Sequence, residues 1–131
     1  MARRRSVPLT EVEQRLMEIV WDLGTATVAH VHETIDAAER PAYNTVQTMM
    51  KILERKGYVR HRTEGRAFVY VPIVDRDAAA RTAVTHLMQR FFGGSPHALA
   101  LNLIEGDHLT RNDLAELERT IAKAREGKDE R

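Results

Sequence analysis

Residues 41–72, PAYNTVQTMMKILERKGYVRHRTEGRAFVYVP, combine a two-faced helix with a short hairpin, and this combination decides the fold. Val46, Met49, Met50 and Leu53 recur at helical spacing and predict a face toward a core. The opposite face carries Asn44, Gln47, Thr48, Lys51 and Arg55. These amide, hydroxyl and cationic groups read base edges and hold phosphates, whereas an ordinary solvated face also carries acids. The sequence therefore predicts a DNA-reading helix over residues 43–56.

The residues that follow this helix predict two strands, 58–62 and 66–71, with a turn at Glu64 and Gly65. Arg62 and Arg66 flank the turn. Charge on an edge strand often serves only solubility. At the tip of a hairpin beside a reading helix, contacts to phosphates or the minor groove are the favoured interpretation. A helix followed by a basic-tipped hairpin is typical of a winged helix-turn-helix.

The distribution of charge supports double-stranded DNA as the partner. The whole chain has a net charge of only +1. Residues 40–66 hold seven cations and two acids, whereas residues 74–131 hold nine cations and ten acids. A positive field is thus concentrated where phosphates would lie. The predicted DNA contacts are Tyr43, Asn44, Thr45, Gln47, Thr48, Lys51, Arg55, Arg62 and Arg66. Tyr43 is equally compatible with a core position. For the basic arm Arg3–Arg5, a solvated tail is favoured over contact with DNA.

Two further helices are predicted before the reading helix. Thr10 and Glu13 form a capping-box pattern, and Gly24 ends the first helix. Its predicted buried stripe is Val12, Leu16, Ile19, Val20 and Leu23. Thr27 is placed to cap the second helix after a short extended link at residues 25–26. Its predicted stripe is Val28, Val31, Ile35 and Ala38. Residues 1–73 are thus predicted to form a winged-helix DNA-binding domain with a basic N-terminal arm.

Residues 74–131 predict three more helices. The first begins at Asp75 and breaks at Gly93 and Gly94, the second spans residues 96–104, and the third begins after Thr110. Their apolar faces are narrow, and a segment this short does not bury a core alone. Two copies packed together would solve this, so we expect a homodimer, although Phe91 and Phe92 also fit a core within one chain. The predicted dimerisation residues are Val84, Leu87, Met88, Phe91, Phe92, Leu114, Leu117 and Ile121. The fold class is therefore mainly α with a small β-hairpin, a winged helix-turn-helix followed by a three-helix dimerisation region.

Several function classes are disfavoured. The chain has no cysteine, which removes thiolate metal sites and cysteine nucleophiles and fits a cytoplasmic protein. The six histidines lack the spacing of metal ligands, and no nucleophile elbow, P-loop or dinucleotide fingerprint occurs. No apolar run is long enough to cross a membrane. We expect no enzyme activity, cofactor or metal site. A metal- or ligand-responsive sensor and a winged-helix protein-docking module are the alternatives.

The chain resembles the penicillinase-repressor (BlaI/MecI-type) family of bacterial transcription regulators. The resemblance covers about residues 9–124 and rests on five segments in order. These are LTEVE (9–13) with IVW (19–21), NTVQTMM (44–50), LERKGYV (53–59), FVY (68–70), and FGGS (92–95) followed by LNL (101–103). It implies a homodimeric winged-helix repressor of palindromic operators that regulates antibiotic resistance.

The same resemblance implies a mode of induction. Some members share an operon with a membrane-bound, zinc-dependent sensor protease and are inactivated by a cut between Asn and Phe. The matching pair here is Asn102 and Leu103, so the cleavage site departs from the pattern. The Cys-x-Cys pairs of the copper-responsive branch are absent. Gln47 stands where an arginine is common, so the operator sequence does not carry over.

Overall fold

The computed structural model describes residues 7–129, so the arm Arg3–Arg5 lies outside the described residues. The chain divides into two compact units, residues 1–86 and 87–131. Among the residues described, no helix has both the length and the apolar character needed to cross a membrane.

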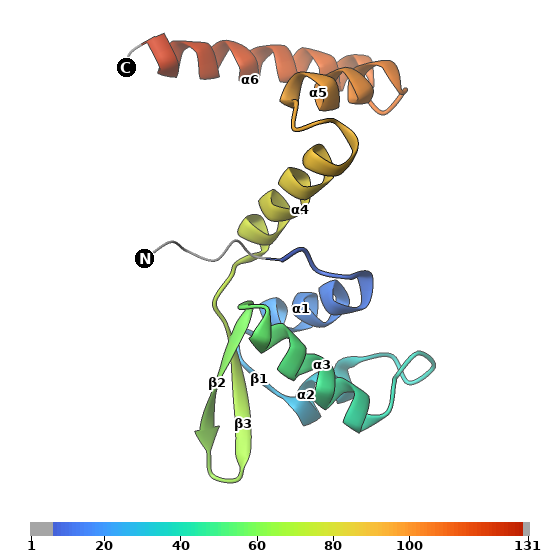
Figure 1. The fold of residues 1–131 in the computed structure, drawn as a ribbon, viewed down its shortest axis with the longest axis vertical. Coiled ribbons are helices and arrows are strands. Elements are labelled where there is room, and N and C mark those ends of the chain that lie inside the picture. The colour runs from blue at the N-terminus through green and yellow to red at the C-terminus, as the bar shows by residue number, and fades with distance from the viewer. Residues whose placement is uncertain (1–6, 130–131) are drawn as a thin grey trace. The chain divides into compact units, whose positions relative to one another are not determined.

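The first unit holds three helices and a small sheet (Figure 1). In chain order its elements are α1 (Glu11–Leu23), β1 (Ala26–Thr27), α2 (Val28–Thr34), α3 (Tyr43–Arg55), β2 (Val59–Glu64) and β3 (Ala67–Pro72), followed by the start of α4 (Arg76–Phe91). The β2–β3 hairpin projects beyond the three helices (Figure 1). We call this hairpin, residues 59–72, the wing. The arrangement confirms the predicted winged helix-turn-helix.

The core of this unit lies where the three helices meet the base of the wing. Its fully buried members include Met17, Val31, Val46, Met50 and Tyr58, each at 0% exposure. The capping box predicted at the start of α1 is present, because the Thr10 hydroxyl accepts from the Glu13 backbone and the Glu13 carboxylate from Thr10. The predicted stripe of α1 is wrong at one position. Val12 is 49% exposed, and Met17 is buried in the apolar face in its place.

The sheet has three strands in the order β1-β3-β2, where the sequence predicted a two-stranded hairpin. The extended link after α1 pairs antiparallel with β3, with Ala26 opposite Tyr70 and Thr27 opposite Val69. A two-residue strand carries no periodic pattern, so this pairing could not be predicted from the sequence. It fixes the base of the wing against the start of α2.

The second helix is shorter than predicted. It ends at Thr34, and Ile35 adopts an extended backbone at the C-cap with ψ 135°. Ala38 lies exposed in the following turn, so it does not extend the buried stripe. Pro41, whose ring disfavours helix in the residue before it, sets the entry into α3.

The rest of the chain forms α4, α5 (Pro96–Glu105) and α6 (Arg111–Asp129). Their predicted starts are present, because Asp75, Ser95 and Thr110 each accept a hydrogen bond from a backbone N–H in the first turn. Two hydrogen bonds between Thr110 and Asp113 hold the pKa of that carboxyl below its ordinary value. Neither α4 nor α5 buries a residue, and every α6 side chain described is at least partly exposed. In one copy, these helices expose the apolar side chains that would normally be covered.

Candidate nucleic-acid interface

The outer face of α3 is polar, cationic and exposed. Val46, Met50 and Leu53 are fully buried on the inner face and fix the helix in the first unit. Asn44, Thr48, Lys51 and Arg55 are exposed on the other side, as helical spacing requires. Tyr43, Thr45 and Gln47 are exposed as well. For Tyr43, 44% exposure excludes the alternative of a core aromatic.

A hollow of about 340 Å³ separates α3 from β3. Tyr43, Gln47 and Lys51 line it from α3, while Arg66 and Phe68 line it from the wing. Its remaining lining comes from Thr27, Val28, Ala29, Ala67 and Tyr70. The structure thus brings four of the nine predicted DNA contacts around one concave surface. The other five, Asn44, Thr45, Thr48, Arg55 and Arg62, lie outside it.

The tip of the wing differs by one residue from the predicted turn. Glu64 pairs with Ala67, so the turn consists of Gly65 and Arg66 rather than Glu64 and Gly65. Gly65 has φ 62°, a conformation that glycine adopts without steric cost. Arg66 therefore lies in the turn itself. Arg62 lies on β2, with its guanidinium 3.7 Å from Glu64, and its side chain is 57% exposed.

The turn that leads into α3 is held by the side chains of Arg40 and His32, which no sequence pattern marks. The Arg40 guanidinium donates to the carbonyl oxygens of Glu33 and Ile35 at 2.9–3.1 Å, closing the C-terminal end of α2. A His32 ring nitrogen lies 3.1 Å from the Pro41 carbonyl oxygen, and its ring meets Tyr43 edge-on at 5.6 Å. Together these contacts fix where α3 begins relative to α2. Contacts of this kind to backbone carbonyls cannot be predicted from residue spacing in the sequence.

A nearly buried ion pair connects α1 to the C-cap of α3. Lys56 Nζ lies 2.6 Å from Glu13 Oε1, with side-chain exposures of 22% and 7%. Burial raises the pKa of Glu13, but the hydrogen bonds from Lys56 and Thr10 outweigh it, so the net pKa is lowered. Burial and the Glu13 charge raise the pKa of the neighbouring Tyr58, whose hydroxyl donates to the Val7 carbonyl. Helix α3 is therefore anchored at both ends.

A second polar contact joins α3 to the wing. His61 Nδ1 lies 2.7 Å from both carboxylate oxygens of Glu54. The His61 ring stacks on Phe68 with centroids 4.2 Å apart and an interplanar angle of 24°. Tyr70 lies opposite His61 on β3. Its pKa is raised mainly by burial and, to a smaller extent, by the Glu54 charge. No pattern in the sequence predicts this contact, because it joins residues on different elements.

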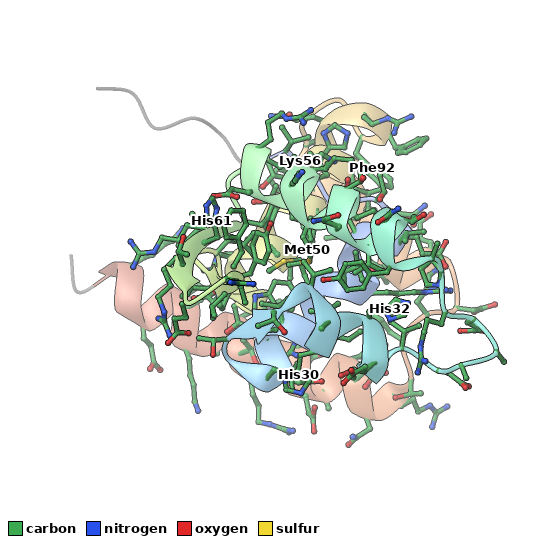
Figure 2. The ribbon with its side chains drawn as sticks, turned by 90° about the horizontal axis from the view of Figure 1, so that it is seen from below. His30, His32, Met50, Lys56, His61 and Phe92 are labelled. Carbon is green, nitrogen blue, oxygen red and sulfur yellow. The ribbon has the colours of Figure 1, made fainter. Side chains whose placement is uncertain are left out.

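The histidines do not assemble into a metal site in the part of the chain that the structure describes. His30 and His32 lie on α2 and His61 lies on β2 (Figure 2). Residues 7–129 contain no group of three His, Cys, Asp or Glu side chains arranged to hold a metal ion.

The predicted dimerisation residues are apolar side chains without full cover. Two of them, Met88 and Phe92, are half-buried. The other six are 36–66% exposed: Val84, Leu87, Phe91, Leu114, Leu117 and Ile121. The predicted cleavage pair, Asn102 and Leu103, lies exposed near the end of α5.

The chain is similar to known transcription regulators and to a solved DNA-binding domain. The family model described as penicillinase repressor matches residues 9–123. The penicillinase repressor of Bacillus licheniformis is 26% identical over 122 residues, 93% of this chain and 95% of that protein. The transcriptional regulator BlaI of Mycobacterium tuberculosis is 34% identical over 118 residues, 84% of this chain and 85% of the relative. The solution structure of the DNA-binding domain of the repressor BlaI superposes with a TM-score of 0.51 at 26% identity, covering 59% of this chain and 93% of that one.

Proposed function

The chain belongs to the penicillinase repressor family, and from this premise we propose that it represses transcription by binding a pseudo-palindromic DNA operator as a homodimer. Its curated relatives are repressors rather than enzymes, in agreement with the expectation of a non-enzymatic protein. DNA as the partner places its action in the cytoplasm.

The observation that carries the DNA proposal is the outer face of α3. It presents Asn44, Thr48, Lys51 and Arg55 to solvent, with no acid among them. An amide reads a base edge, while a cation neutralises a phosphate. In our proposal Asn44, Gln47 and Thr48 lie near bases, and Lys51 and Arg55 lie near the backbone.

The wing supplies a second set of contacts. Arg62 and Arg66 project from the strand and the turn into solvent. Such cations give sequence-independent affinity through counterion release. With Tyr43 and Thr45 at the start of α3, they complete the proposed contact surface.

The homodimer rests on the helices after the wing. Leu87, Phe91, Leu117 and Ile121 are each more than 40% exposed. Leu87 and Phe91 lie one turn apart on α4, as Leu117 and Ile121 do on α6, and clustered apolar exposure of this kind is typical of an interaction surface. A second copy would cover it and would place two reading helices on two half-sites, about one or two helical turns apart.

The test is to sequence genomic fragments retained by the purified protein and then to compare three variants on the enriched site. Gln47→Ala should relax base choice at a cost of about 1–3 kcal/mol per lost bidentate contact. Lys51→Ala and Arg62→Ala should weaken all sequences alike and lower the salt slope by about one unit. Unchanged affinity and preference in Gln47→Ala would show that Gln47 does not read bases. Retention of no preferred sequence would refute the proposed operator.

A further inference from the structure

The distal part of the wing has no core of its own. Every residue from Arg60 to Phe68 is exposed, and the buried wing residues Val59, Val69 and Tyr70 all lie nearer its base. The ladder between β2 and β3 holds the two strands to each other, with His61 opposite Tyr70. It does not fix the angle of the hairpin against α3. That angle decides whether both parts reach the same DNA.

The base of the wing is held by the β1 pairing and by Val59 and Tyr70 in the core, whereas one polar side-chain contact joins the last turn of α3 to the wing beyond that base. The Glu54 carboxylate comes from the last turn of α3 and meets His61 Nδ1 at 2.7 Å. Within residues 7–129 no other side-chain hydrogen bond or ion pair joins α3 to the wing. Both side chains are about one-third exposed, 32% for Glu54 and 34% for His61, so solvent weakens the contact only partly.

The His61 ring extends the contact across the hairpin. It stacks on Phe68 from β3, which is itself 45% exposed. Through this stack, the contact with Glu54 reaches both strands of the wing. Glu54 is also the only acid within α3, beside a surface suited to phosphates. An acid beside a phosphate-binding surface repels the DNA backbone, so Glu54 needs another role to explain its position.

We propose that Glu54 and His61 are positioning residues that hold the wing at the angle where its cations and α3 engage one operator together. This inference rests on the proposed DNA-binding function. Neither residue need touch DNA. Their role is to fix Arg62 and Arg66 relative to Gln47 and Lys51.

The experiment uses the full-length protein and the DNA fragment that the wild type enriches. Loss of an acid near phosphates should by itself tighten binding. The proposal requires the opposite for Glu54→Ala, about threefold to thirtyfold weaker binding, the range expected for residues that couple two contact regions. The salt slope should fall by about one unit, because wing contacts to phosphate are lost. Glu64→Ala is the matched control, because Glu64 is an acid on the wing itself and its loss should tighten binding.

Two further variants separate positioning from a general effect on the fold. Glu54→Gln keeps an oxygen that accepts from His61 and should recover affinity to within about threefold of wild type. In an Arg62→Ala background Glu54→Ala should lose most of its effect, whereas in a Gln47→Ala background the effect should persist. Thermal unfolding checks that each variant is folded.

Tighter or unchanged binding by folded Glu54→Ala would overturn the inference, as would full additivity with Arg62→Ala. Failure of the wild type to select any DNA would instead refute the proposed function, so the two failures are distinguishable.

Discussion

Replacing Glu13 by glutamine tests whether the Glu13–Lys56 pair anchors α3 to α1. Glutamine keeps its place in the capping box, because its side-chain oxygen still accepts from Thr10. It also leaves Lys56 a neutral acceptor, so the change removes the charge but not the contact. A hydrogen bond between charged groups contributes about 1.5–3 kcal/mol and a neutral one about 0.5–1.5 kcal/mol. At 2.6 Å and 7% exposure of the carboxylate, the free energy of unfolding should fall by about 1–1.5 kcal/mol.

Urea and thermal unfolding measure this loss, and Tm should fall by about 3–6 °C. The loss should also depend on pH. The folded-state pKa of Glu13 is lowered from its ordinary value of 4.5. Its contribution is therefore complete above that value and disappears as the pH falls through the lower, folded-state pKa. Wild type and variant should differ fully at neutral pH and converge in acid.

Glu11→Gln on the same turn is the control. The Glu11 carboxylate is 79% exposed beside Arg15, so this change should cost less than about 0.5 kcal/mol. A Glu13→Gln loss that is equal at neutral and acid pH, or no larger than that of Glu11→Gln, would refute the assignment of the ion pair.

Four other predictions follow from the same structure. A fragment of residues 1–86 should fold, sediment as a monomer and bind operator far more weakly than the full chain, because linkage of two heads is lost; a full chain that sediments as a monomer at micromolar concentration would contradict the dimer. Arg40→Ala should cost about 1 kcal/mol in urea unfolding, because carbonyls at the end of α2 lose their donors, and Arg40→Lys should not restore the forked geometry. Gly106→Ala should loosen the end of α5 and speed limited proteolysis there, because an added Cβ would lie 2.7 Å from the Asn102 carbonyl oxygen. If cleavage is the inducing event, Asn102→Asp combined with Leu103→Ala should keep the protein intact on immunoblots of the native host under cell-wall antibiotic stress, whereas intact wild type during full derepression would exclude cleavage as the switch.

The helix boundaries that depend on local chemistry could be predicted from the sequence. A helix cap satisfies backbone donors within one turn, so a few adjacent residues are enough to predict it. This holds for Thr10 with Glu13 and for Ser95 before Pro96. The inner face of α3 could also be predicted, because Val46, Met50 and Leu53 recur at the helical period.

The parts that were missed depend on contacts between elements. The strand at Ala26 and Thr27 exists only because β3 lies beside it. Val12 fits the apolar spacing of α1, but the packing of α1 uses Met17 instead. The Glu54–His61 contact required the hairpin register and the end of α3 to be known together. The candidate interface was thus predicted residue by residue, but its internal supports were not.

The absence of buried side chains in α4 and α5 has an evolutionary consequence. A side chain in an ordinary core is constrained by many neighbours in its own chain, whereas Leu87, Phe91 and Leu101 have few such neighbours to satisfy. In a homodimer their main constraint is the matching surface of an identical copy, which changes whenever they do. Such a surface can accumulate substitutions while two identical copies remain complementary to each other. Two related repressors in one cell would then lose the ability to pair with each other, and duplicated genes would acquire separate regulatory circuits without any change in how they read DNA.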